Sequence, residues 1–349
     1  MDKLKTRVLF ISLIILALVS ISAVAAADSV NDDIINANQE DFDLSEETND
    51  VEQLGAKAID DTDSKGPLAA GDPGSFSELQ DLIDATPADG ILELDSNYIM
   101  GSEDKPLIIN KTITIDGKGN TLDANHLNAT LYAVSQVNLK NIVFINGNCT
   151  SEFTLPGALY VRGTVSLIKG SDGSTIDNCT FKDNAALMGG GVYWTSKEGT
   201  LTNSRFENNV ANSFVEGKTS VGGAIYCSGS NNKIDNCNFT DNSVSHSGGA
   251  IYYENANDPL VNNSYFYNNT CLRQGSNSGG AIYYKNSPRG RIENSNFTEN
   301  AVKGAGGAIH IDKNSKNQSI IESSFSKNTA EGLDANGVSP VQGYGGGAI

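Results

Sequence analysis

Carboxylates recur at two positions of a repeated pattern in the second half of this 349-residue chain, and paired carboxylates could cleave a polysaccharide. The first position reads Asp177, Thr202, Asp235, Asn262, Glu293 and Ile321. The second position reads Asp183, Asn208, Asp241, Asn268, Glu299 and Lys327. Acids alternate with other residues in both series and no basic residue is fixed among them, whereas such chemistry needs clustered carboxylates with Arg, Lys or Ca²⁺ beside them. We therefore expect outward, solubilising positions and no catalytic residue.

Other reactive groups do not form a recognisable site in the sequence. The three histidines, His126, His246 and His310, share no motif, so a nucleophile–base pair cannot be assembled from them. The chain has no phosphate-binding loop, no Cys/His metal pattern and no basic aromatic patch. Its formal net charge of −18 argues against binding to nucleic acid. We expect no cofactor, no metal and no nucleic-acid partner.

Aromatic residues recur at a third position, directly after copies of a Gly-Gly-Ala-Ile pattern. That position reads Tyr160, Trp194, Tyr226, Tyr252, Tyr283 and His310. If the preceding aliphatic residue points inward, these rings point outward as a stripe that could bind sugars or a protein through flat faces. The alternative is a packing ladder that stabilises the strands or underlies a loop. The first five rings are our candidate binding residues.

Two repeated tetrapeptides must position all of these side chains. Phe-x-x-Asn begins at Phe181, Phe206, Phe239, Phe266, Phe297 and Phe325, and Gly-Gly-Ala-Ile copies lie between them. The period of 25 to 33 residues indicates stacked supersecondary units rather than one globular core.

Each repeat predicts one coil of three short strands. An aliphatic residue stands five positions before each Phe. Two positions after that aliphatic residue stands Asn, in all copies but one, which has Glu322. Residues five apart in a straight strand face opposite sides, so a bend must lie between them, and Asn tolerates the left-handed backbone of a sharp turn. The last Asn of Phe-x-x-Asn predicts a second turn, and Gly-Gly predicts the third. Parallel stacking of such coils about 4.8 Å apart gives an all-β, right-handed parallel β-helix.

The alternation of these tetrapeptides resembles the repeats of chlamydial polymorphic outer-membrane proteins and, more closely, the adhesin-like surface proteins of methanogenic archaea, over roughly residues 157–349. Residues 113–123 resemble the opening coils of the pectate-lyase-like β-helix group. The resemblance implies an exported cell-surface protein that binds host, partner-cell or glycan surfaces. A polysaccharide lyase or hydrolase and a structural cell-wall component are the alternatives.

The first 70 residues predict export and a spacer. Residues 1–27 read as a signal peptide with a basic start, an apolar run and a small-residue end, although the run could also span a bilayer uncleaved. Residues 28–70 read as an acidic disordered linker, because residues 28–63 hold thirteen acidic side chains and one basic one. Residues 71–349 are the predicted β-helix, which we expect to be truncated at its C-terminus.

A short amphipathic helix is expected to cap the first coil. Phe76, Leu79, Leu82 and Ile83 fall at helical spacing, with Ser77 as the expected N-cap. Such a helix would shield apolar side chains and strand edges from solvent.

The cysteines are expected to be small, semi-buried residues. They are Cys149, Cys179, Cys227, Cys237 and Cys271. Two of them occupy the same repeat position two coils apart, about 9.6 Å by the stacking distance, which is too far for a disulfide. Their spacing matches no metal motif.

Insertions are expected at one corner of the coil. The segments after Asn209, Asn269 and Asn328 are longer than their counterparts in the other repeats, and a separate excursion at 162–175 is expected to leave from a different corner. Such loops either carry recognition or reflect tolerance of the corners to insertion.

Export would also make glycosylation possible. The candidate sequons are at Asn110, Asn128, Asn148, Asn262, Asn268 and Asn317. The expected partner is a cell-surface glycan or protein, with attachment to a membrane or cell wall through a region outside this chain.

Overall fold

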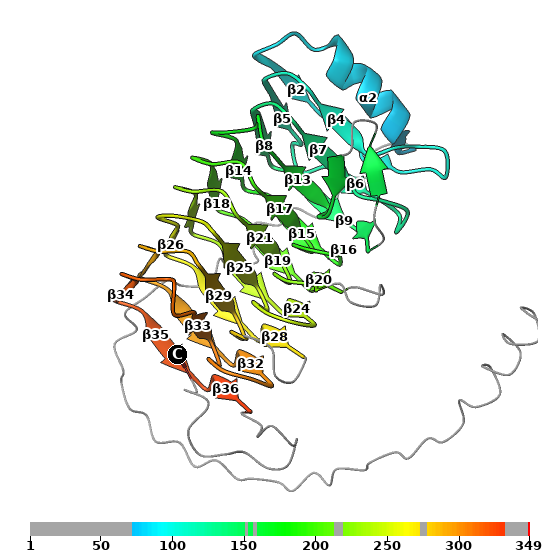
Figure 1. Cartoon of the computed structure of the whole chain (residues 1–349). Helices are drawn as coiled ribbons and strands as arrows, with labels where there is room; N and C mark the ends of the chain where they lie inside the picture. The colour runs from blue at the N-terminus through cyan, green and yellow to red at the C-terminus, as the bar shows by residue number, and fades with distance from the viewer. Residues whose placement is uncertain (1–71, 151–152, 156–158, 213–218, 273–277, 332–347) are drawn as a thin grey trace, which may run out of the picture. The chain divides into compact units, whose positions relative to one another are not determined.

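The computed structural model describes residues 72–150, 153–155, 159–212, 219–272, 278–331 and 348–349 (Figure 1). The predicted signal peptide (1–27) and acidic linker (28–70) lie outside the described residues. Among the residues that are described, no helix is long and apolar enough to cross a membrane.

Parallel strands stack coil upon coil into four long sheets, as Figure 1 shows from the cyan to the red end. The Ile sheet has nine strands: β2 (Gly90–Glu93), β5 (Ile113–Asp116), β8 (Val137–Lys140), β14 (Thr175–Asp177), β18 (Thr200–Thr202), β22 (Lys233–Asp235), β26 (Leu260–Asn262), β30 (Arg291–Glu293) and β34 (Ser319–Ile321). The Phe sheet has ten: β1 (Gly74–Ser75), β3 (Tyr98–Ile99), β6 (Thr121–Asp123), β9 (Val143–Ile145), β15 (Thr180–Lys182), β19 (Arg205–Glu207), β23 (Asn238–Thr240), β27 (Tyr265–Tyr267), β31 (Asn296–Thr298) and β35 (Ser324–Ser326).

The other two long sheets complete each coil. The short sheet has seven strands: β10 (Asn148–Cys149), β16 (Ala185–Ala186), β20 (Val210–Ala211), β24 (Ser243–Val244), β28 (Thr270–Cys271), β32 (Ala301–Val302) and β36 (Thr329–Ala330). The Tyr sheet has eight: β4 (Leu107–Ile109), β7 (Leu131–Ala133), β13 (Val165–Leu167), β17 (Val192–Trp194), β21 (Ile225–Cys227), β25 (Ile251–Glu254), β29 (Ile282–Lys285) and β33 (Ile309–Ile311). An antiparallel pair, β11 (Phe153–Leu155) and β12 (Leu159–Val161), stands apart from them. The prediction of three strands per coil is therefore wrong, because the short sheet adds a fourth.

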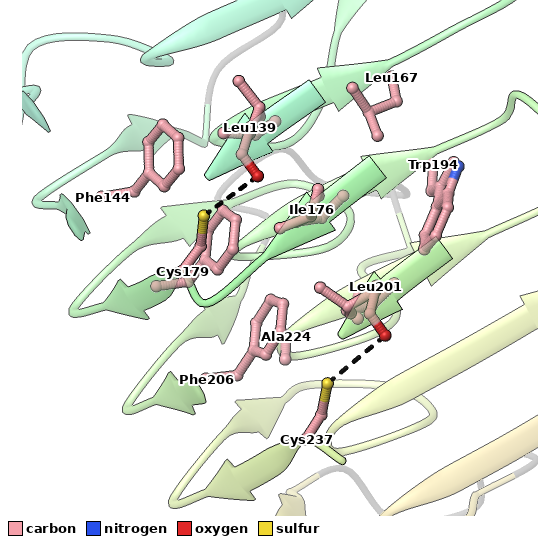
Figure 2. Packing of buried hydrophobic residues seen from close by; sticks show 14 of the residues in the cluster. Leu139, Phe144, Leu167, Ile176, Cys179, Trp194, Leu201, Phe206, Ala224 and Cys237 are labelled. Carbon is pink, nitrogen blue, oxygen red and sulfur yellow. Dashed lines mark hydrogen bonds between the residues drawn. The ribbon is translucent and has the colours of Figure 1, made fainter. Parts of the chain in front are cut away.

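The predicted interior columns are confirmed. Neighbouring Phe rings of the Phe sheet stack at centroid distances of 4.6 to 5.0 Å, and the aliphatic residues of the Ile sheet lie beside them in register. Figure 2 shows Ile176 and Leu201 packed in the same interior as Phe144 and Phe206. The bend between the two sheets is also as predicted, since Asn178 and Asn203 have φ of 50° and 51°.

The last Asn of Phe-x-x-Asn has a different role from the one predicted. The left-handed residue is the preceding one, such as Asp241 with φ of 57°, while Asn242 is fully buried. The Asn242 side-chain amide donates to the carbonyls of Phe206 (2.9 Å) and of the Asn269 side chain (3.0 Å). Buried backbone groups at this corner need partners, and a column of asparagines supplies them.

Glycine doublets occupy the corner between the short sheet and the Tyr sheet, as predicted. Gly222 has φ of 66°, which favours glycine. A Cβ on Gly223 would stand 2.0 Å from the carbonyl oxygen of Gly249 in the next coil. The first glycine of the pair therefore serves the turn, and the second allows close stacking of coils.

The helix α2 (Phe76–Ala85) covers the first coil, as expected. It buries Phe76, Leu79 and Ile83 but leaves Leu82 42% exposed. The N-cap is Ser75 and not Ser77, because Ser75 and Glu78 form a reciprocal capping box.

The cysteines were expected to be semi-buried, but all five are fully buried. Burial raises the pKa of Cys179 and Cys237 to about 12. Their column alternates with serine: the backbone N–H of Cys179 donates to Ser204 Oγ at 3.0 Å. The Cys179 and Cys237 thiols donate to carbonyls of the preceding coil (Figure 2).

Candidate functional site

The predicted outward position of Trp194 is wrong. In the Tyr sheet, Tyr193 aligns with Tyr226 and Trp194 aligns with Cys227 of the core. The Trp194 side chain is 0% exposed and lies among the buried residues of the interior (Figure 2). Its indole N–H donates to Ser196 Oγ at 3.1 Å. Residues 189–191 are three consecutive glycines, so the Gly-Gly-Ala-Ile pattern can be aligned with this repeat in two ways. The correct alignment begins one residue earlier than the predicted one.

Tyr160 does not belong to the stripe either. It lies in β12, where it pairs with Thr154 of the antiparallel β11. The predicted excursion at 162–175 instead contains β13, a regular strand of the Tyr sheet that pairs with β7 and β17. The extra residues precede β13, because Gly163-Thr164-Val165 takes the place of Gly-Ala-Ile.

The remaining candidates, Tyr226, Tyr252 and Tyr283, form a packed column together with Tyr193 and His310, which we call the Tyr ladder. Successive ring centroids are 4.9, 5.9, 5.2 and 5.1 Å apart. Tyr226, Tyr252 and Tyr283 are only 7%, 5% and 2% exposed, and they pack with Val221. The ladder is therefore a packing layer on the outer side of the Tyr sheet, in which these three rings have no open face for a ligand and the end members Tyr193 and His310 are half-buried.

Glu254 and Lys285 form an ion pair beside the Tyr ladder. The Tyr226 hydroxyl donates to Glu254 Oε2 at 2.9 Å, and Lys285 forms an ion pair with Glu254 Oε1 at 2.7 Å. Burial and the Glu254 charge both raise the pKa of Tyr226 above its usual value, so this phenol stays protonated and neutral.

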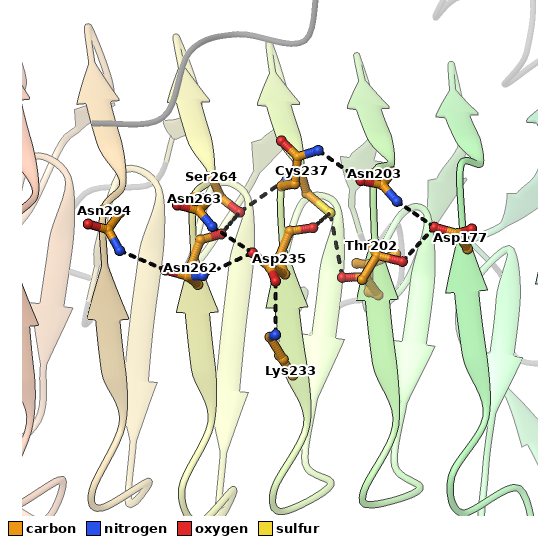
Figure 3. Close-up of polar contacts among 12 residues, drawn as sticks. Asp177, Thr202, Asn203, Lys233, Asp235, Cys237, Asn262, Asn263, Ser264 and Asn294 are labelled. Atoms are coloured by element: carbon orange, nitrogen blue, oxygen red, sulfur yellow. Dashed lines mark hydrogen bonds and ion pairs between the residues drawn. The ribbon is translucent and has the colours of Figure 1, made fainter. Parts of the chain in front are cut away.

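Two carboxylates of the first acidic series, those of Asp177 and Asp235, accept hydrogen bonds from the next coil (Figure 3). Thr202 Oγ1 and Asn203 Nδ2 donate to Asp177 Oδ1 at 2.6 and 2.7 Å. Asn262 and Asn263 Nδ2 donate to Asp235 Oδ1 in the same manner, and Lys233 of the same strand forms an ion pair with Asp235 at 2.8 Å.

Burial tends to raise the pKa of Asp235, but hydrogen bonds from Lys233, Asn263 and Asn262 outweigh it and lower that pKa. A carboxylate held ionised in this way is a poor general acid or base at neutral pH. The alternation of acids and amides is therefore a hydrogen-bonded ladder between coils, which explains why the acids stand two coils apart.

The geometry gives little support to catalysis by histidine or to metal binding. The backbone N–H of Ser220 donates to His246 Nδ1 at 3.3 Å, and Ser220 Oγ lies 3.4 Å from the same nitrogen. A ring nitrogen that accepts from a backbone N–H is a weak base for the neighbouring hydroxyl. Within the described ranges, no three His, Cys, Asp or Glu side chains are grouped so as to hold a metal ion.

An aromatic pair that we had not singled out lies on the outer face of the Phe sheet. Tyr265 and Tyr267 flank the inward Phe266 on β27, and both rings are half-buried. Their centroids are 6.1 Å apart and their planes differ by 6°. The signal was present in the sequence: Tyr-Phe-Tyr stands where other repeats have Asn-Phe-Thr or Arg-Phe-Glu.

The sequon asparagines differ in accessibility. Asn110, Asn268 and Asn317 are exposed, whereas Asn128, Asn148 and Asn262 are half-buried. Asn262 and Asn268 also donate through their amides to Asp235 and Asp241 of the preceding coil, at 3.0 and 2.7 Å. Glycosylation stays a prediction, and at these two positions it would replace ladder hydrogen bonds.

Insertions leave from one corner, on alternate coils. The strands that precede the longer segments are β10, β20, β28 and β36, all in the short sheet. The strands between them, β16, β24 and β32, lead to the Tyr sheet by short connections, of which the first two carry the bridging residues Met188 and Ser247. The predicted single corner is thus confirmed for the described roots of these segments.

Comparison with known proteins agrees with this geometry. The model of a family described as "Right handed beta helix region" matches residues 163–343, more than half of the chain. No curated protein matches the chain. The stacked parallel coils and this match together show that the chain belongs to the right-handed β-helix family.

Proposed function

We propose that this protein is exported and displayed at the cell surface, where its β-helix binds glycans or proteins of another surface as an adhesin does. The observation that carries the proposal is the common origin of the insertions at one corner of alternate coils. Loops on a rigid scaffold are where recognition residues usually lie. A stack of coils holds such loops in a fixed row along one edge, which suits binding through many weak contacts.

The outer faces support binding more than catalysis. Inward positions repeat one residue type along the stack, whereas outward positions of the Phe sheet change from coil to coil, as in Arg205, Asn238 and Tyr265. The acids that could have served an enzyme are engaged as acceptors between coils. Residues 1–27 have the pattern of a secretory signal, which supports export.

Binding of the purified, fluorescently labelled protein to whole cells tests the proposal. We expect a saturable isotherm that unlabelled protein displaces. Binding that rises linearly without saturation would point to a structural wall component without a specific partner.

Incubation of the purified protein with soluble polysaccharides tests whether it is instead a polysaccharide lyase or hydrolase. Release of reducing ends or unsaturated uronides from soluble polysaccharides, growing with time, would overturn the assignment. Export is tested separately by fusing residues 1–27 to a reporter enzyme, which we expect to be recovered outside the cell.

A further inference from the structure

Tyr265 and Tyr267 differ from the rings of the interior Phe column and of the Tyr ladder. Those rings stack from coil to coil, at 4.6 to 5.9 Å, and thereby stabilise the stack. Tyr265 and Tyr267 instead stack within a single strand. Their register neighbours are Asn238 and Asn296 for Tyr265, and Thr240 and Thr298 for Tyr267.

No aromatic neighbour on the adjacent coils extends the pair into a ladder. The flanking side chains are shorter than tyrosine, so the two rings stand above a floor of amides and hydroxyls. Two half-buried rings at this place contribute little to coil stacking and keep apolar surface in contact with water. That combination indicates a surface for a partner rather than a packing element.

The groups around the rings select the chemistry of that partner. Asn238, Thr240 and Thr298 offer uncharged donors and acceptors on both sides of the pair. Glu299 accepts a hydrogen bond from the Tyr267 hydroxyl, which with the Glu299 charge raises the pKa of that phenol, and Asp241 follows Thr240 in the chain. Asp241 and Glu299 place two carboxylates at this border, and Glu299 pairs with the cation of Lys327 at 3.4 Å, so the border disfavours acidic polymers.

We propose that the outer face of the Phe sheet at Tyr265 and Tyr267 binds a neutral polysaccharide, whose sugar rings stack their C–H faces on the two phenol rings. This inference rests on the proposed binding function and names the class of ligand for one face of the β-helix. Amides and hydroxyls of the neighbouring coils would hydrogen-bond the sugar hydroxyls.

Affinity gel electrophoresis of the full chain tests the inference with three soluble probes: a β-1,3-glucan, an α-mannan and polygalacturonate. We expect retardation by at least one neutral polymer and none by polygalacturonate. Replacing both rings, Tyr265→Ala with Tyr267→Ala, should lower the affinity for the neutral polymer at least about tenfold. Because both rings are only half-buried, the double variant should keep the thermal midpoint of the parent within a few degrees.

Two control variants make the result specific. Tyr265→Phe with Tyr267→Phe keeps the flat rings and should retain most of the binding. Arg205→Ala with Glu207→Ala changes the same face two coils away and should retain all of it. Equal affinity of the double alanine variant, or retardation by polygalacturonate alone, would overturn the inference.

Whole-cell binding separates this inference from the proposed function. If cells bind the double alanine variant as well as the parent, the Tyr265 and Tyr267 surface is not the binding face, while the adhesin-like function stands. If the double variant loses cell binding but periodate oxidation of the cell glycans leaves binding of the parent intact, the partner is a protein and the glycan assignment fails. If no cell binds the parent, the proposed function itself fails.

Discussion

At the residue scale, the buried asparagine column ties each coil to both of its neighbours. Asn242 accepts hydrogen bonds from the backbone N–H and the side-chain amide of Asn209, at 3.0 and 2.9 Å. It donates in turn to Phe206 and Asn269. Each of these atoms is buried, so each depends on its neighbour in the column instead of on water.

Replacing Asn242 with alanine should therefore lower the free energy of unfolding by about 3 to 5 kcal/mol, because the Asn209 N–H and Phe206 C=O lose their partners. Asn238→Ala, at a half-buried outward position of the same coil, is the control and should cost about 0.5 kcal/mol or less. Urea denaturation followed by circular dichroism measures both. Equal effects of the two substitutions would contradict the role of the column.

Substitutions at two glycines distinguish two reasons for glycine: lack of space for a Cβ and a positive φ. Gly223→Ala places a Cβ against the Gly249 carbonyl, so coils must separate, and we expect a loss of about 3 kcal/mol. Gly119→Ala meets no atom within 4 Å but has φ of 88°, so it should cost only about 1 kcal/mol of backbone strain. Thermal melts of both variants check the order, and a larger loss at Gly119 would be inconsistent with close coil stacking.

Single residues were predictable where the repeat assigns one role to one residue type. The left-handed Asn178 and the inward Phe residues follow from local backbone preference and from periodicity. Trp194 was misplaced because three glycines permit two alignments, and only pairing with the neighbouring coil decides between them. The buried position of Asn242 likewise depends on atoms of adjacent coils, more than twenty residues away in sequence.

At the element scale, Asp104 fixes helix α2 to the first coils. Its carboxylate accepts hydrogen bonds from the backbone N–H of Phe76 (3.3 Å), of Ser77 (3.1 Å) and of Gly101 (2.8 Å). Partial burial tends to raise the pKa of Asp104, but hydrogen bonds from Ser77, Gly101 and Phe76 outweigh it and lower that pKa. An acceptor at the first turn of a helix also complements its dipole.

The lowered pKa gives a prediction for pH. A depressed folded-state pKa contributes stability above the unfolded pKa of about 3.9, and the contribution is lost as pH falls through the folded value. Asp104→Asn should therefore melt at a lower temperature than the parent above about pH 4, and the difference should shrink toward pH 2. Melting curves of both proteins across this range check the trend, and a constant difference would refute it.

Elements were predictable in proportion to their length. The ten residues of α2 show a helical apolar face, and that helix was expected. Its N-cap was misjudged because Ser75 and Ser77 both suit the position, and Asp104, distant in sequence, engages Ser77. The short sheet was missed because its two-residue strands are too brief to show alternation.

At the scale of the whole molecule, acids and amides alternate along the stack with a period of two coils. Asp177 and Asp183 lie beside Thr202 and Asn208, and Asp235 and Asp241 come one coil later. Carboxylates on adjacent coils would be about 4.8 Å apart and would repel each other. The natural unit of this β-helix is therefore a pair of coils, which matches the insertions on alternate coils.

Deleting one coil, residues 200–232, preserves the strand register but brings Asp177 against Asp235 and Asp183 against Asp241. We expect a lower melting temperature at pH 7 that recovers near pH 4, where the paired carboxylates share protons. Deleting two coils, residues 200–259, places Asp177 beside Asn262 and Asp183 beside Asn268 and is the matched control.

The longer deletion should be the more stable of the two at pH 7, although it removes more interfaces. In both, Trp194 meets a tyrosine, Tyr253 or Tyr284, so the change inside the core is similar. If the single-coil deletion is the more stable at pH 7, the two-coil unit has no physical basis.

Binding without turnover distinguishes an adhesin from a polysaccharide lyase or hydrolase, and both properties can be measured on one complex. The purified protein is mixed with a soluble polysaccharide that retards it in affinity electrophoresis. The complex is isolated by size-exclusion chromatography with light scattering, and the polysaccharide is recovered after denaturing the protein. The account predicts a saturable gain in mass and a recovered polymer of unchanged length even after prolonged incubation. A polymer that shortens with time, or a mass that never changes for any polysaccharide or cell-surface extract, would contradict it.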